Sequence, residues 1–123
     1  MREILNPATE EVIAKVPDQS PEKAVKAAAK AFPMWAAKSP AERSSLMLKW
    51  AGLVERDLQR LAELESRNTG KPIKLARDGD IPFASDNLKF FAGAARLMEG
   101  SGSGEYVPGY TSMIRREPVG VVA

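Results

Sequence analysis

The side chains that can do chemistry in this chain are carboxylates, ammonium groups and guanidinium groups, because its 123 residues include no cysteine and no histidine. This composition excludes a thiolate nucleophile, a disulfide, a histidine proton relay and a zinc site of the usual kind. We therefore predict no catalytic residue and no cofactor-binding residue in this chain. Two carboxylates, Asp78 and Asp80, stand where a helix is expected to begin. Either they cap this helix and interact with its dipole, or they recognise a cationic group from outside.

Three glycines at positions 100, 102 and 104 suggest a nucleotide-binding loop at first sight. A dinucleotide loop requires a preceding strand, a following helix and the spacing G-x-G-x-x-G. Here a helix is expected before the glycines and a strand after them, and the spacing differs. We therefore interpret residues 100–104 as a flexible joint.

The aromatic side chains have two interpretations as well. Phe83 and Phe90 are seven residues apart and share one helical face, whereas Phe91 belongs to a buried stripe. The first pair either packs against a partner surface or forms one wall of an apolar substrate channel. Trp35 and Trp50 are expected to pack in the core or between helices.

The overall composition is that of a globular protein, with 44% hydrophobic and 28% charged residues. The net charge is only +2, and acidic and basic residues alternate, so we predict a solvated surface and no nucleic-acid partner. Carboxylates such as Glu63 and Glu65 are expected on such an exposed face. No window approaches the ~18 apolar residues of a membrane span, so we expect no membrane association and a cytoplasmic location.

Short β segments are predicted at both ends of the chain. In residues 1–19, two strand-like runs surround the turn residues 6–9, which predicts a β-hairpin. A second hairpin is predicted for residues 105–117, around a Pro-Gly turn. Residues 118–123 are apolar and typical of a buried parallel strand. This ending suggests that the chain is cut where a further domain would begin.

Residues 20–99 predict a layer of about four helices. The first helix is expected to begin after the capping residue Ser20 and to end at Pro33. A capping box, Ser39 with Glu42, predicts the start of the second helix. Asp57 is expected to begin a third helix after a bend.

Gly70 is expected to end that third helix. A last helix is predicted from about residue 80 to residue 99, with Asp80 as its cap and Pro82 in its first turn. Its buried stripe is predicted to contain Ile81, Ala84, Leu88, Phe91, Ala95 and Met98.

Four stretches, taken in order, resemble one family: residues 6–9 (Asn-Pro-Ala-Thr), 64–72 (Leu-Glu-Ser-Arg-Asn-Thr-Gly-Lys-Pro), 90–93 (Phe-Phe-Ala-Gly) and 115–122 (Arg-Arg-Glu-Pro-Val-Gly-Val-Val). Their order and spacing are similar to the N-terminal part of the NAD(P)-dependent aldehyde dehydrogenases. The resemblance covers essentially the whole chain. Residues 104–116 are most similar to the γ-aminobutyraldehyde dehydrogenase branch, whose members oxidise small amino-aldehydes.

The resemblance implies an α/β family fold, to which this chain contributes a mainly α segment, and an oxidoreductase that uses NAD or NADP. A thiolate attacks the aldehyde, hydride passes to NAD(P), and the thioester is hydrolysed. The cysteine, the general-base glutamate and the oxyanion-stabilising asparagine are expected beyond residue 123. The isolated chain is therefore predicted to be inactive. Within the complete enzyme it is expected to contribute scaffold, a channel wall and subunit contacts.

Particular positions carry over from the family. The resemblance implies a structural Na or K site at the backbone carbonyls of Ile4 and Leu5 and the side chain of Asn68. Asn68 replaces the family's acid, so we expect weak binding. Asp80 matches an acidic position that contacts the substrate amine, and Phe83 lies on the following turn, where channel residues lie.

One departure is Glu10, where the family usually has glycine, so we expect positive φ to be disfavoured there. The resemblance also implies that the 105–117 hairpin belongs to an oligomerisation element. Two alternatives to the enzyme fragment follow. One is a non-catalytic module that pairs with itself or with a complete enzyme. The other is an inactive truncated product.

Overall fold

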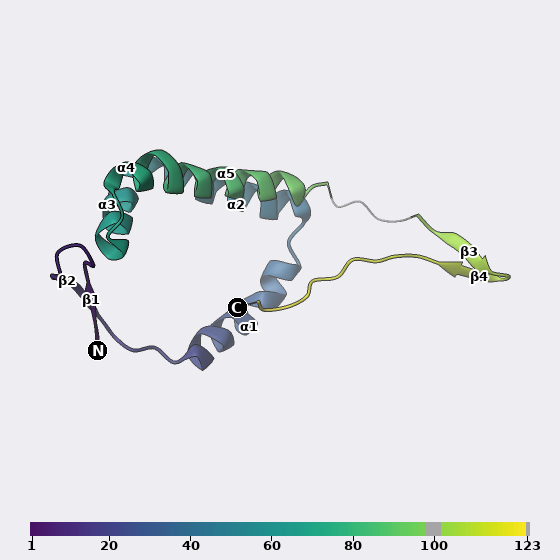
Figure 1. Ribbon diagram of the computed structural model, residues 1–123. Coiled ribbons are helices and arrows are strands. Elements are labelled where there is room, and N and C mark those ends of the chain that lie inside the picture. The colour runs from purple at the N-terminus through teal and green to yellow at the C-terminus, as the bar shows by residue number, and fades with distance from the viewer. Residues whose placement is uncertain (98–101, 123) are drawn as a thin grey trace.

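The computed structural model describes residues 1–97 and 102–122 (Figure 1). Its elements follow in the order β1 (Arg2–Leu5), β2 (Val12–Val16), α1 (Pro21–Ala36), α2 (Pro40–Arg56), α3 (Leu58–Thr69), α4 (Ile73–Leu75), the π-helical turn η1 (Ala76–Asp80), α5 (Ile81–Ala94), β3 (Gly104–Val107) and β4 (Tyr110–Ser112). The prediction of a mainly helical chain flanked by two β-hairpins is confirmed. Gly104, expected in the joint, begins β3, and residues 100 and 101 of the joint lie outside the described residues.

The two hairpins are separate antiparallel ribbons, β1 with β2 and β3 with β4. In the turn before β2, the side chain of Asn6 accepts a hydrogen bond from the backbone of Ala8 at 2.9 Å. Glu10 has φ of 61°, so the left-handed conformation expected to be disfavoured there is adopted without a glycine. Its N–H donates to the carbonyl of Asn6 at 2.8 Å, which holds this conformation in place.

Helix α1 starts where the sequence predicts, after Ser20 and with Pro21 as its first residue. The Ser20 hydroxyl does not cap the backbone, however; it donates to the carboxylate of Glu22. The prediction that Pro33 ends the helix is wrong, because α1 continues to Ala36. Proline removes one N–H donor from the helix, and on this exposed last turn water can satisfy the carbonyl that is left.

Helices α2 and α3 follow their predicted boundaries. At the start of α2, the backbone N–H of Ser39 donates to the Glu42 carboxylate at 2.8 Å, and the N–H of Glu42 donates to the Ser39 hydroxyl at 3.3 Å. The predicted capping box is therefore confirmed. The chain bends at Asp57, which separates the two helices as expected. Gly70, with φ of 74°, ends α3 in the left-handed conformation.

Helix α5 returns along α2, and these two helices form the main contact of the layer (Figure 1). Small residues line the contact and allow the two backbones to approach closely; the buried ones are Ser44, Ala51, Ser85 and Ala92. The Ser85 hydroxyl donates to the carboxylate of Glu55 at 3.0 Å, and Lys89 pairs with the same carboxylate. Both interactions hold the pKa of Glu55 below its ordinary value, the lysine contact more strongly.

The predicted apolar stripe of this helix is wrong in part. Ala84 and Phe91 are exposed, while Ser85 and Ala92 take the buried positions one residue later. Trp50 is 58% exposed and does not pack in a core, and Trp35 is 41% exposed. The helix ends at Ala94, and Met98 lies outside the described residues.

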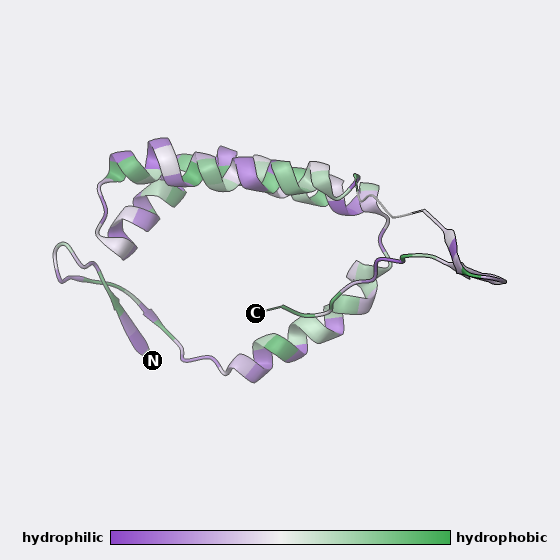
Figure 2. Cartoon of the chain, turned by 45° about the vertical axis from the view of Figure 1, so that its right-hand side comes forward, coloured by the Kyte–Doolittle hydropathy of each residue, from purple (hydrophilic) through white to green (hydrophobic). Residues whose placement is uncertain are grey.

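The chain has an open shape, with β3 and β4 extending far from the helices (Figure 1). Its accessible surface is 9914 Å². A compact monomer of 13.4 kDa would expose about 6,500 Å². Apolar segments, green in Figure 2, therefore remain uncovered on the helices and the C-terminal tail. The four fully buried apolar residues of the described chain are all alanines: Ala51, Ala62, Ala76 and Ala92.

The C-terminal tail runs back to α1 in both views (Figures 1 and 2). Residues 116–118 and 120–122 line two hollows against the helix face that carries Phe32 and Trp35. The strand expected at 118–123 is not formed in residues 118–122, because no other strand of the described chain lies beside them to supply ladder hydrogen bonds. Among the described residues, no helix combines the length and apolar character that crossing a membrane requires.

Candidate functional site

The candidate site lies where α3 ends and the next helix begins, around the loop that carries Lys71. The N–H of Gly70 donates to the carbonyl of Ser66 at 2.8 Å, and the Ser66 hydroxyl donates to the carbonyl of Lys71 at 2.7 Å. Gly70 also lies against the turn of the N-terminal hairpin, since a Cβ there would be 3.3 Å from Pro7. Local hydrogen bonds and this contact therefore fix the position of Lys71.

Asp80 lies at the end of a π-helical turn inside a continuous helical segment, residues 73–94. The N–H of Ile81 donates to the carbonyl of Ala76, which closes the wide turn. Asp80 has φ of −60° and ψ of −49° and makes no capping hydrogen bond, so its predicted role as the cap of a new helix is wrong. The sequence signal misleads because Pro82 usually follows a helix start, whereas here the helix reaches proline through the wider turn.

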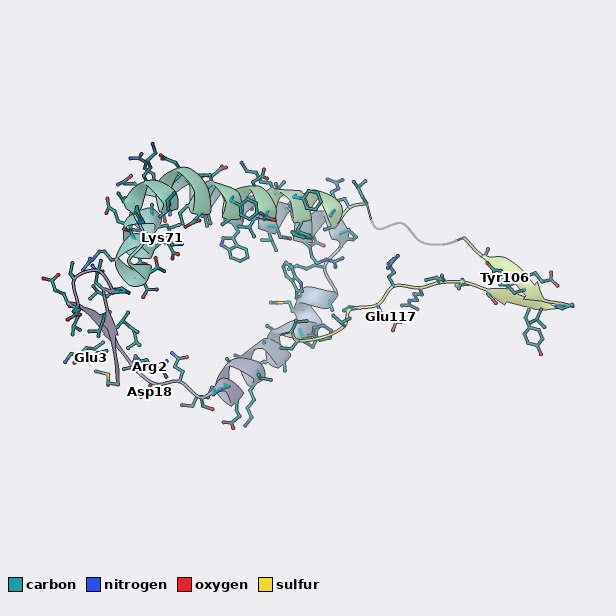
Figure 3. All side chains as sticks on the ribbon, viewed as in Figure 1. Arg2, Glu3, Asp18, Lys71, Tyr106 and Glu117 are labelled. Carbon is teal, nitrogen blue, oxygen red and sulfur yellow. The ribbon has the colours of Figure 1, made fainter. Side chains whose placement is uncertain are left out.

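Three charged side chains meet at this turn. The ammonium of Lys71 lies 2.6 Å from Oδ2 of Asp80 and 2.9 Å from Oε1 of Glu65 on α3. The hydrogen bond to Asp80, and then the one to Glu65, raise the pKa of Lys71 above its ordinary value. Figure 3 labels Lys71 beside α3 and α4. The two carboxylates and one ammonium leave this cluster a net charge of −1.

Asp78, the other predicted carboxylate, does not join this cluster. It pairs with its neighbour Arg77 at 2.6 Å, and this guanidinium lowers the pKa of Asp78. The two aspartates therefore have different partners and do not form a carboxylate pair. Asp80 has a cationic partner within the chain, Lys71, and its recognition of a cationic group from outside stays a prediction.

Phe83, the second predicted channel residue, lies one turn after Asp80 and is 70% exposed. Phe90 is also exposed and meets the ring of Phe91 edge to face, with 5.2 Å between ring centroids. Asp80 and Phe83 line neither the hollow beside the N-terminal hairpin nor the two hollows beside the C-terminal tail. Their role in a substrate channel stays a prediction.

The predicted cation site is brought together in part. A hollow of about 400 Å³ separates the N-terminal hairpin from α3 and the start of α5, and both Ile4 and Asn68 line it. Leu5 does not line it. Its walls are mostly apolar, and Glu65 is the one acidic residue among them. The oxygen donors suit a hard monovalent cation, but Lys71 already engages that carboxylate.

Lys71 and Glu65 are the residues that sequence reasoning missed. Glu65 was expected on an exposed face, yet its side chain is only 34% exposed. Their signal in the sequence is the left-handed stop at Gly70, which turns Lys71 back toward the helix that it follows.

The comparisons with known proteins agree on one family. The sequence model of the Aldehyde dehydrogenase family matches residues 1–123. A 2-aminomuconic semialdehyde dehydrogenase from Danio rerio is 48% identical over 90 residues, which are 71% of this chain and 18% of the relative. A betaine aldehyde dehydrogenase from Vibrio vulnificus is 41% identical over 97% of this chain and 25% of its own length.

Solved structures agree with the sequence matches. An aldehyde dehydrogenase from Bacillus cereus in complex with NAD+ superimposes with a TM-score of 0.87 at 38% identity, covering 96% of this chain and 25% of the other. PnpE in complex with nicotinamide adenine dinucleotide gives a TM-score of 0.89 at 34% identity, covering 96% and 25%. The chain thus spans between about a fifth and a quarter of the relatives that it matches.

Proposed function

Because this chain belongs to the aldehyde dehydrogenase family, we propose that it is part of an oxidoreductase that converts small aldehydes into acids with NAD or NADP. The cofactor accepts a hydride, and water supplies the second oxygen of the acid. The single observation that carries the proposal is the family match along the whole chain. The resemblance of residues 115–122 to the family supports it further.

The chain by itself is catalytically incompetent in this proposal. It has no cysteine to attack the aldehyde and no histidine to move a proton. The glycines at positions 100, 102 and 104 do not have the spacing G-x-G-x-x-G of a dinucleotide-binding loop. The nucleophile and the NAD(P) site therefore belong to the remainder of the enzyme. The large exposed surface of 9914 Å² supports a segment that works within a larger assembly.

The substrate class that we propose is small aldehydes with a cationic nitrogen group, of the γ-aminobutyraldehyde type. Asp80 contacts the substrate cation, and Phe83 forms part of the apolar wall beside it. The net charge of −1 on the Asp80 cluster favours a cation there. Relatives named for 2-aminomuconic semialdehyde and betaine aldehyde support a nitrogen-containing substrate.

The experiment uses the holoenzyme, meaning the polypeptide that carries residues 1–123 together with the cysteine-bearing, NAD(P)-binding remainder. NADH formation is followed with γ-aminobutyraldehyde and with a neutral aldehyde of equal length. Asp80→Asn is expected to lower kcat/KM for the cationic aldehyde about 10- to 100-fold, since a hydrogen bond to a charged group is lost. An equal loss on both aldehydes would contradict a substrate contact. Turnover by the 123-residue chain alone would refute its incompetence.

A weak Na or K site is the second part of the proposal. The amide oxygen of Asn68 and the carbonyl of Ile4, which line the hollow, would hold the ion together with the carbonyl of Leu5. Glu65 also lines the hollow, but its carboxylate is paired with Lys71. Asn68→Asp restores the acid and is expected to strengthen binding. We would compare the Tm of both proteins in sodium, potassium and choline chloride at one ionic strength. Equal Tm values for the aspartate variant in all three salts would remove the site.

A non-catalytic assembly role is the alternative, and the β3–β4 hairpin favours it. Tyr106 and Tyr110 are 78% and 70% exposed on this two-stranded ribbon, whose edges offer unpaired backbone groups. In either role we propose a homo-oligomer in the cytoplasm. Light scattering after size exclusion distinguishes the two readings, because a discrete oligomer of the chain alone supports the module and a monomer contradicts it.

A further inference from the structure

We propose that Lys71 is a positioning residue for Asp80, which fixes one carboxylate oxygen so that the other is directed to the substrate cation. Lys71 thereby sets the preference for cationic over neutral aldehydes. This inference rests on the proposed function, because it requires that Asp80 contacts the substrate.

Lys71 engages only one of the two carboxylate oxygens of Asp80. Lys71 reaches Oδ2 of Asp80 at 2.6 Å, and Oδ1 accepts no hydrogen bond from any described residue. One oxygen is thus engaged and the other is available. A carboxylate has acceptor sites on both oxygens, so an internal ammonium and a substrate ammonium can be bound together.

The three side chains of the cluster are exposed to different extents. Lys71 is 32% exposed and Glu65 is 34% exposed, whereas Asp80 is 47% exposed. The aspartate is therefore the member that faces outward. Glu65 belongs to α3, so its contact with Lys71 ties the lysine to a separate helix. The contact with Glu65 thus restrains the ammonium independently of Asp80.

The side chain of Asp80 makes no hydrogen bond that caps the helix. Asp80 ends a π-helical turn, in which one residue more than in an α-helical turn is enclosed. Lys71 supplies the side-chain contact that orients it. Because the pKa of Lys71 is raised, the ammonium keeps its charge throughout the neutral pH range.

A different role for Lys71 predicts the opposite change in substrate preference. If Lys71 only repels the substrate cation, its removal raises the cluster's negative charge and improves the cationic substrate. If it orients Asp80, its removal leaves a carboxylate that is more strongly charged but wrongly placed, and the cationic substrate becomes poorer.

The test measures kcat/KM of the holoenzyme for γ-aminobutyraldehyde and for a neutral aldehyde of equal length. Lys71→Met is expected to lower the cationic-to-neutral ratio about tenfold, mostly through kcat for the cationic aldehyde, while the neutral aldehyde changes less than about twofold. Lys71→Arg is expected to restore the ratio, since it keeps the charge and the donor groups. A higher ratio in Lys71→Met, or an equal loss on both aldehydes, would overturn the proposal.

A matched control is Lys89→Met. Lys89 is 46% exposed and pairs with Glu55 on the same helical layer, so it controls for the loss of a comparable lysine–glutamate pair. Its ratio is expected to stay unchanged. Asp80→Asn separates the two hypotheses: if it leaves the ratio unchanged, the substrate contact itself fails. If it lowers the ratio while Lys71→Met does not, only the role of Lys71 fails.

Discussion

Gly70 joins the end of α3 to the turn of the N-terminal hairpin, and its replacement by alanine tests this connection. The residue has φ of 74°, a conformation that side chains with a Cβ disfavour. A Cβ at this position would be 3.3 Å from Cβ of Pro7 and 3.4 Å from the backbone nitrogen of Ala8. Alanine therefore meets both backbone strain and a tight contact with a rigid proline.

The expected magnitude follows from these two effects. The left-handed conformation costs a residue with a Cβ about 1–2 kcal/mol. Alanine also reduces the entropy of the unfolded chain, which offsets about 0.4–1 kcal/mol. The crowding of Pro7 adds to the cost, so Gly70→Ala is expected to lower the free energy of unfolding by about 1 kcal/mol. Gly70→Asn is expected to cost less, because asparagine tolerates this conformation better.

Gly52 provides the matched control. It lies inside α2, and a Cβ there would meet no atom within 4 Å. Gly52→Ala is therefore expected to raise the free energy of unfolding by about 1 kcal/mol through helix propensity. Urea unfolding of the chain, followed by far-ultraviolet circular dichroism, measures both variants. Equal effects of the two substitutions would refute the argument, because it requires opposite signs.

Ser39→Ala is expected to cost about 1 kcal/mol through the lost cap. The hydrogen bonds from Ser39 lower the pKa of Glu42. Their contribution to the free energy of unfolding is therefore complete above the ordinary glutamate pKa and is lost as pH falls through the lowered pKa. The part of the wild-type advantage that depends on the Glu42 carboxylate should thus decline as pH falls below the ordinary glutamate pKa, whereas the Glu42 N–H keeps its acceptor on Ser39. A difference in helicity that does not change with pH would contradict this. Ala92→Leu is expected to lower the free energy of unfolding by about 1–3 kcal/mol, because it overpacks the α2–α5 contact. Ala29→Leu on the exposed helix α1 is expected to change it by less than about 0.5 kcal/mol. Equal urea midpoints for the two variants would argue against the buried contact. Glu10→Gly is expected to stabilise the chain by about 0.5 kcal/mol, since the relief of positive φ exceeds the entropy cost, and a lower Tm would contradict the strained turn.

Local signals in the sequence determined most helix boundaries. Ser39 and Glu42 define the start of α2 through two hydrogen bonds within one turn, and Gly70 ends α3 through its own backbone preference. Such features depend on residues three or four positions apart, so the sequence alone contains the necessary information. The family resemblance also came from the sequence, because the order and spacing of four short stretches carry it.

The sequence pattern did not determine which residues of the helices are buried. The stripe that includes Phe91 was predicted from helical period alone, yet Phe91 is exposed and Ser85 is buried. A period shows which residues share a face, but the neighbouring helix decides which face is covered. In this chain the α2–α5 contact selects small residues, because close backbone approach stabilises it.

In the candidate site, too, the sequence determined some features and the tertiary structure determined others. The sequence identified Asp80 and the residues near the hairpin turn, but it placed Asp80 as a cap. The tertiary structure determined that Lys71 and Glu65 come to the aspartate, because the left-handed turn at Gly70 and the π-helical turn together bring α3 and η1 side by side. Residue types and short spacings are encoded locally, whereas a pairing between groups nine and fifteen residues from Asp80 exists only once the helices have packed.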